Sequence, residues 1–237
     1  MAAAVAAGMT GREIREHALS ATGSQRKLLS RFWKTRPASI KDIILGGFRV
    51  GQFDLERILL GFLPDALPDS FEDLTIPMIA VAADFYAASE VVMAEGPLRS
   101  ALAASSSIPA VFRPVRRDGR VLVDGGMLNP VPFDHLEGLA DVVVGVDVAG
   151  SPQGDGSRLP TAVEALYGAS QLLQRSVVSL KAHRFLPDVL LRPEVGSYRS
   201  LDFAKAKEIL EATSGTREAT KRAVDAAMSA RLSAAVA

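Results

Sequence analysis

The chain alternates short apolar runs with longer segments of helical periodicity, and this alternation constrains its fold more than any other feature of the sequence. The apolar runs, each bounded by Pro, Gly or Asp, cover residues 76–83, 121–123, 141–148 and 189–191. The run at 141–148 is rich in valine, which is typical of a strand covered on both faces in a largely parallel sheet. Residues 79–85 and 89–93 are expected to pair, as a hairpin or as an extension of the sheet edge. Together these features predict an α/β fold.

Helix starts are marked by a Thr or Ser followed three residues later by an acid, at Thr10–Glu13, Ser70–Asp73 and Thr161–Glu164. Periodicity predicts helices near 10–20, 24–33, 54–62, 97–106, 161–183, 203–212 and 215–233. The Gly-rich segment 151–158 is expected to be a loop, too short to link two domains. We therefore expect a single domain over residues 1–237, ending in C-terminal helices within 203–237.

Composition excludes several classes of function. Lys plus Arg and Asp plus Glu both number 27, so no chain-wide charge favours nucleic acid. The chain contains no cysteine, which excludes disulfides and thiolate metal sites. It has no apolar stretch near the ~20 residues of a membrane span, and its start does not resemble a signal peptide. We expect a soluble, cytoplasmic protein, for which peripheral contact with a membrane is the only remaining membrane role. The basic residues around Trp33 suit a lipid surface, although a solvated helix face is favoured.

Asp124 is the first candidate for chemistry. The segment 120–123 has the pattern of a strand, and Asp124-Gly125-Gly126 follows it directly. Ligands bind at the carboxyl ends of strands in open α/β sheets, and two glycines allow a sharp turn and a close approach. Taken alone, the tripeptide is also compatible with a turn in which the aspartate caps a loop.

Three blocks of sequence change that balance: Ile-Pro-Met-Ile-Ala-Val-Ala-Ala-Asp at 76–84, Glu-Gly-Pro-Leu-Arg-Ser-Ala-Leu-Ala-Ala-Ser-Ser-Ser-Ile-Pro-Ala-Val-Phe at 95–112, and Val-Asp-Gly-Gly-Met-Leu-Asn-Pro-Val-Pro at 123–132. In order and spacing they resemble the second half of a patatin-like phospholipase. The resemblance implies a three-layer fold related to the α/β hydrolases, with a mostly parallel central sheet. It also implies hydrolysis of lipid acyl esters by a Ser/Asp dyad through an acyl-serine intermediate, without a cofactor. Asp124 then matches the catalytic aspartate, supported by Gly125 and Gly126.

The family's Gly-rich oxyanion turn and Gly-x-Ser-x-Gly elbow do not occur in this sequence. Residues 1–9 resemble the end of the small-residue helix that follows the elbow serine. We therefore expect truncated N-terminal strands, a nucleophile a few residues upstream of Met1, and no activity of the chain by itself. The alternative is a non-catalytic relative that binds lipid or protein.

Other candidates are weaker. Ser170 is expected inside a helix, Ser24 lacks the partners of a Ser-x-x-Lys site, and the segment 105–107 is expected to end a helix beside the site. His17, His135 and His183 lack metal-ligand spacing, and no residue cluster predicts a metal or cofactor site. The glycines at 46–51 fit a loop better than a phosphate cradle. The apolar run at 48–63 is compatible with an acyl-chain pocket, although core packing is favoured.

Overall fold

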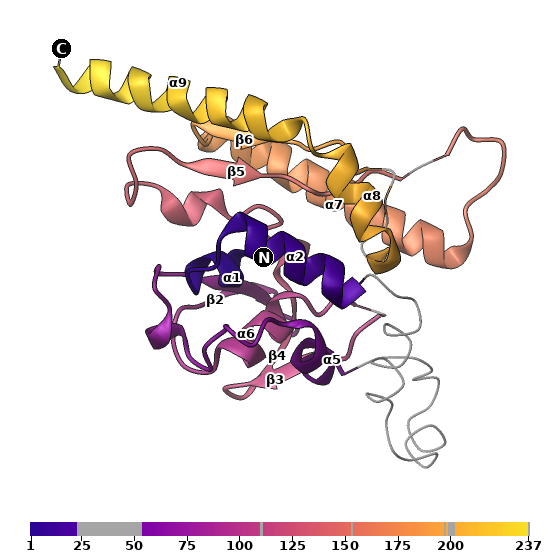
Figure 1. Ribbon diagram of the computed structural model, residues 1–237. Helices are drawn as coiled ribbons and strands as arrows, with labels where there is room; N and C mark the ends of the chain where they lie inside the picture. Colours follow the sequence, from indigo (N-terminus) through magenta and orange to yellow (C-terminus); the bar gives the residue numbers. More distant parts are fainter. Residues whose placement is uncertain (23–53, 110, 153, 197, 199–201, 237) are drawn as a thin grey trace, which may run out of the picture. The chain divides into compact units, whose positions relative to one another are not determined.

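The computed structural model describes residues 1–22, 54–109, 111–152, 154–196, 198 and 202–236, which form two compact units, Met1–Gly126 and Met127–Ala237 (Figure 1). The expected single domain over residues 1–237 stays a prediction. The helix expected at 24–33, the residues around Trp33 and the glycines at 46–51 lie outside the described residues, as does the first part of the apolar run 48–63.

The first unit begins with two short helices, α1 (Ala2–Ala6) and α2 (Gly11–Thr22). The predicted capping of α2 is confirmed, because the Thr10 amide donates to the Glu13 carboxylate at 2.7 Å and the Glu13 amide donates to Thr10 Oγ1 at 3.3 Å. Two further helices, α5 (Leu55–Phe62) and α6 (Leu98–Ser105), match the predicted ranges 54–62 and 97–106. Buried residues of α1, α5 and α6 belong to one hydrophobic cluster.

The Ser70–Asp73 prediction is wrong in detail. Instead of a capped α-helix, the structure has a single 3-10 turn, η1 (Phe71–Asp73), and Ser70 makes no side-chain cap. The Ser70 hydroxyl hydrogen-bonds to the Glu72 carboxylate and to the Gly96 carbonyl, and the Gly96 amide donates to Glu72 at 2.9 Å. A contact with Glu72 and contacts to the distant Gly96 therefore replace the predicted cap.

A four-stranded sheet forms the centre of the first unit. Its strands are β1 (Ala80–Asp84), β2 (Ser89–Met93), β3 (Val115–Arg117) and β4 (Arg120–Asp124), in the order β2-β1-β4-β3. All of its pairings are antiparallel, and the predicted hairpin between β1 and β2 is confirmed. One face of the sheet packs against α6 through residues such as Ala82, Leu122 and Val115, which belong to the same cluster as Leu98.

The mostly parallel central sheet that the sequence predicts is found only in part, as one parallel pair of strands in the second unit. Strand β5 (Val144–Val146) pairs with β6 (Val189–Leu191), and Val144 lies opposite Val189. The α/β class is thus confirmed, whereas a parallel arrangement is found only in this pair among the described strands. The full coverage expected for 141–148 is wrong, since burial alternates along β5 and Val146 is 49% exposed.

Long helices make up most of the second unit. Helix α7 (Ala162–Arg184) starts at a complete capping box between Thr161 and Glu164, as predicted. The C-terminal helices are also confirmed, as a 3-10 turn η4 (Phe203–Lys205), α8 (Ala206–Ala212) and α9 (Thr216–Val236). Among the described helices, none combines the length and the apolar character that crossing a membrane requires.

Candidate functional site

Asp124 is the last residue of β4, as the sequence predicts, and its backbone is fixed on two sides. It lies opposite Ala82 in the pairing with β1. Its amide donates to the Ser107 carbonyl at 3.0 Å, which ties the strand end to the segment that follows α6. Sequence reasoning placed residues 105–107 at a helix end beside the site, and α6 does end at Ser105. The carbonyl contact itself had no sequence signal.

The two glycines after Asp124 have separate roles. A Cβ atom on Gly125 would lie 2.2 Å from the Val81 carbonyl oxygen, so only glycine fits against that backbone. The Gly126 amide donates to Asp124 Oδ1 at 2.7 Å, and Gly125–Met127 forms a short 3-10 turn, η2. The close approach that the sequence predicts at these glycines is therefore a contact within the chain, between Gly125 and the Val81 backbone.

Burial raises the pKa of Asp124 above its ordinary value, and the hydrogen bond from the Gly126 amide opposes that effect by stabilising the carboxylate. Within the described residues, no lysine, arginine or histidine forms an ion pair with Asp124. A carboxylate with a raised pKa, held rigidly at a strand end, is suited to accept a proton from a neighbouring hydroxyl or water.

Neither Ser107 nor Ser170 is arranged as a nucleophile. Ser107 is fully buried, and its hydroxyl donates to the Ala103 carbonyl at 2.6 Å. Ser170 lies inside α7, as predicted, and its hydroxyl donates to the Tyr167 carbonyl. Neither hydroxyl is therefore directed toward an acidic side chain that could accept its proton.

Two of the three histidines contact backbone carbonyls. His17 Nε2 lies 2.8 Å from the Phe62 carbonyl, which connects α2 to the end of α5, and His183 Nδ1 lies 2.7 Å from the Ser179 carbonyl. His135 lies in the 3-10 turn η3 (Phe133–Leu136). Over the described part of the chain, no group of three or more His, Asp or Glu side chains is arranged to hold a metal ion.

A second polar cluster lies within the second unit and was not identified from the sequence. Lys181 Nζ donates to the Val131 carbonyl at 2.9 Å and also to the side chains of Asn129 and Asp134. Asn129, which is 4% exposed, donates to both oxygens of Asp134 at 3.2 Å. Burial by itself would raise the pKa of Asp134, but hydrogen bonds from Lys181 and Asn129 and the charge of Lys181 outweigh it and lower that pKa.

A sequence model described as patatin-like phospholipase matches residues 1–136, which include Asp124, Gly125 and Gly126. The chain is 41% identical over 100 residues to an uncharacterized NTE family protein of Mycobacterium bovis, covering 42% of this chain and 28% of that protein. It is also 30% identical over 167 residues to patatin-like phospholipase domain-containing protein 7 of Rattus norvegicus, covering 59% of this chain and 12% of that protein. The chain thus spans less than a third of the length of these relatives.

Proposed function

Because this chain belongs to the patatin-like phospholipase family, we propose that it is the part of a lipid acyl hydrolase that carries the base of a Ser/Asp dyad, Asp124. The observation that supports this role most directly is the carboxylate of Asp124, which is held at a strand end and whose pKa is raised by burial. A general base works best when its pKa lies close to the working pH, and burial moves an aspartate in that direction.

In the proposed reaction, a serine hydroxyl attacks the acyl carbon of a lipid ester while Asp124 accepts the hydroxyl proton. The tetrahedral intermediate expels the alcohol, which takes that proton, and an acyl-serine remains. Water then attacks the acyl-serine, Asp124 accepts a proton from the water, and the fatty acid leaves as the serine regains its hydrogen. Each half of the reaction therefore uses the same carboxylate, first as base and then as acid.

The nucleophile of this proposal is a serine outside residues 1–237, because the printed sequence contains no Gly-x-Ser-x-Gly. We propose a cytoplasmic protein that meets its substrate at a membrane surface. Gly125 and Gly126 support the base by allowing the close approach to Val81 and by donating to Asp124.

The test is hydrolysis of p-nitrophenyl butyrate and of phosphatidylcholine by this chain and by a form extended upstream of Met1. We expect activity only in the extended form, and Asp124→Asn should lower its kcat by at least about 100-fold, the contribution of a general base. Asp65→Asn is the matched control, since Asp65 is an exposed turn residue of the same unit, between α5 and η1. Its kcat should change less than about twofold.

An extended form that folds but hydrolyses neither substrate would sink the hydrolase proposal. The non-catalytic alternative would then remain, a relative that binds lipid or protein without turnover. Equal losses in Asp124→Asn and Asp65→Asn would show that the effect comes from a general structural change and not from the base.

A further inference from the structure

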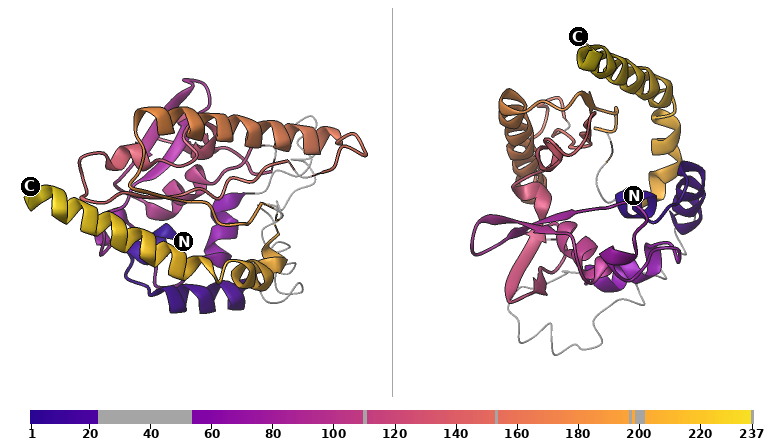
Figure 2. Two further views of the ribbon diagram at one scale, coloured as in Figure 1. Left: turned by 90° about the horizontal axis from the view of Figure 1, so that it is seen from above. Right: turned by 90° about the vertical axis from the view of Figure 1, so that its left-hand side faces the viewer.

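Two hairpin turns meet at one end of the four-stranded sheet. Strand β1 ends at Asp84, and the turn to β2 covers 85–88, while Asp118 and Gly119 join β3 to β4. Because Asp84 lies opposite Leu122 in an antiparallel pairing, the end of β1 is beside the start of β4. Both turns therefore lie at the end of the sheet opposite Asp124. The β1–β2 hairpin is the projecting ribbon at the left of the right-hand view in Figure 2.

Exposed aromatic side chains occupy the β1–β2 turn. Phe85 is 58% exposed and Tyr86 is 81% exposed, and their rings pack edge to face with centroids 5.2 Å apart. Hydrogen bonds hold the backbone of this turn. Asp84 Oδ1 accepts from the amides of Tyr86 and Ala87 at 3.1 Å. The Phe85 amide donates to the Val121 carbonyl at 2.8 Å. The aromatic pair is thus presented to solvent by a fixed turn.

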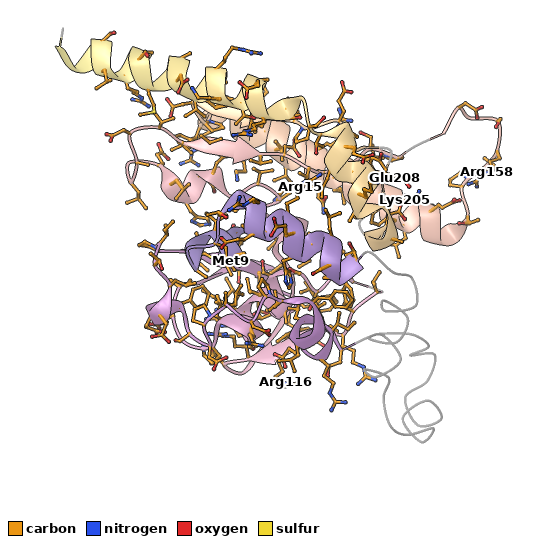
Figure 3. The ribbon with its side chains drawn as sticks, viewed as in Figure 1. Met9, Arg15, Arg116, Arg158, Lys205 and Glu208 are labelled. Carbon is orange, nitrogen blue, oxygen red and sulfur yellow. The ribbon has the colours of Figure 1, made fainter. Side chains whose placement is uncertain are left out.

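Two exposed arginines lie on the neighbouring hairpin. Arg116 pairs with Val121, whose carbonyl also binds the Phe85 amide, so Phe85 and Arg116 lie on either side of Val121 across the sheet. Arg116 is labelled at the lower edge of the first unit in Figure 3. Arg120 begins β4 at the same end. Among the described residues, no carboxylate forms an ion pair with Arg116 or Arg120.

Arg117, between them in sequence, has a different environment. It donates to the carbonyls of Pro97 and Glu95 at 2.8 and 2.9 Å and pairs with Asp118 at 3.4 Å. Its charge is therefore used inside the unit, whereas those of Arg116 and Arg120 face solvent. We define Phe85, Tyr86, Arg116 and Arg120 as the sheet tip.

We propose that the sheet tip docks on an anionic lipid bilayer. Tyrosine, which combines an apolar ring with a polar hydroxyl, concentrates at the boundary between headgroups and acyl chains, and Tyr86 can reach it from a projecting turn. The wholly apolar ring of Phe85 beside it can enter the acyl-chain side of that boundary. Arginines beside them attract anionic headgroups. The formal charge of the whole chain is zero, so the attraction is local to the tip. This docking does not depend on turnover and is measured without it.

The test is co-sedimentation of the chain with vesicles of phosphatidylcholine alone and with phosphatidylserine added. Binding is expected only to the anionic vesicles, and at about 1 M salt it should disappear because the screening length falls to about 3 Å. The double variant Arg116→Gln/Arg120→Gln should bind about 25-fold more weakly, about fivefold for each charge. Phe85→Ala/Tyr86→Ala should lose at least about tenfold through the apolar contact.

The matched control is Arg12→Gln/Arg15→Gln, which removes two exposed arginines from α2 in the same unit. Arg15 is labelled in Figure 3. Its binding should stay within about twofold of the unchanged chain. A second measurement places a fluorophore at the tip: Tyr86→Trp in a Trp33→Phe background should show a blue-shifted emission with anionic vesicles only.

The proposal is overturned if the unchanged chain does not bind anionic vesicles, or if the tip and α2 variants weaken binding equally. Equal binding to neutral vesicles would remove the role of the arginines. If Phe85→Ala/Tyr86→Ala instead abolishes a concentration-dependent self-association seen by sedimentation, the tip is an interface between copies of the chain. Loss of hydrolysis in any form of the protein leaves the vesicle result unaffected.

Discussion

At the scale of single residues, the candidate site depends on a short contact between two backbones. Gly125 lies so close to Val81 that a residue with a Cβ atom does not fit at position 125. This contact fixes the turn that directly follows Asp124. The neighbouring Gly126 contributes its amide to the carboxylate. The Asp124 carboxylate is thus positioned by two glycines, which have no side chain.

Gly125→Ala should destabilise the chain by about 1–3 kcal/mol or more, because the new Cβ would force the Val81 backbone to move. Urea unfolding followed by circular dichroism measures the change. Gly11→Ala is the control, since Gly11 is in helix α2 and a Cβ there has no neighbour within 4 Å. That variant should be neutral or slightly more stable. Equal effects of the two substitutions would contradict the contact.

Asp124→Asn should change how stability depends on pH. The folded-state pKa of Asp124 is raised, so its contribution to stability is complete below the ordinary pKa of 3.8 and is lost as pH rises through the folded value. Asparagine keeps an oxygen for the Gly126 amide but cannot ionise. The stability of Asp124→Asn relative to the unchanged chain should therefore increase from about pH 3 toward neutrality. Urea unfolding of both forms across that range measures it, and a pH-independent difference would contradict the raised pKa.

At the scale of elements, helix α7 is joined to the segment that follows Asp124 by one lysine. Lys181 reaches Asn129, Val131 and Asp134, and its ammonium lies 4.5 Å from the centre of the Phe133 ring. The Lys181 side chain is 19% exposed, so this cluster is better shielded from water than the ion pairs on α9. One residue of α7 therefore holds the 129–134 segment by charge, hydrogen bonds and an aromatic contact.

Lys181→Met should cost about 1–3 kcal/mol, because it removes one hydrogen-bond donor from the buried Asn129 and a charged donor from the Asp134 carboxylate. The pKa of Asp134 is lowered in the folded chain, so its contribution is present above 3.8 and is lost as pH falls through the folded value. The cost of Lys181→Met should shrink accordingly in acid. Lys221→Met, which breaks an exposed pair with Asp225 on α9, is the control and should cost under about 0.5 kcal/mol. Thermal and urea unfolding at two pH values measure both costs. Equal costs of Lys181→Met and Lys221→Met would contradict a stabilising role of the cluster.

At the scale of the whole molecule, the match to the family model falls mainly on the first unit. The family model ends at residue 136, so it covers the first unit and only the start of the second. The proposed base, Asp124, and the proposed membrane-docking tip lie at opposite ends of one antiparallel sheet in the first unit. The zero formal charge of the chain means that binding to any charged surface depends on where charges gather and not on their sum.

Interactions between near neighbours in the chain were determined by the sequence itself. The Thr-x-x-Glu boxes at Thr10 and Thr161 formed as predicted, because a cap and its acid are only three residues apart. The β1–β2 hairpin and the strand that ends at Asp124 were likewise readable, since turn residues and apolar runs act locally. The identity of the candidate base followed from that placement together with the family resemblance.

Only the tertiary structure decided the features that join distant segments. The pairing of β1 with β4, the approach of Val81 to Gly125 and the burial that raises the pKa of Asp124 connect residues about 40 positions apart. Ser70 shows the same effect, because its contact with Gly96 replaced the cap that its local sequence predicts. A local pattern states what a residue is able to bind, but which partner is present depends on how distant parts of the chain pack, and packing energy outweighs local propensity.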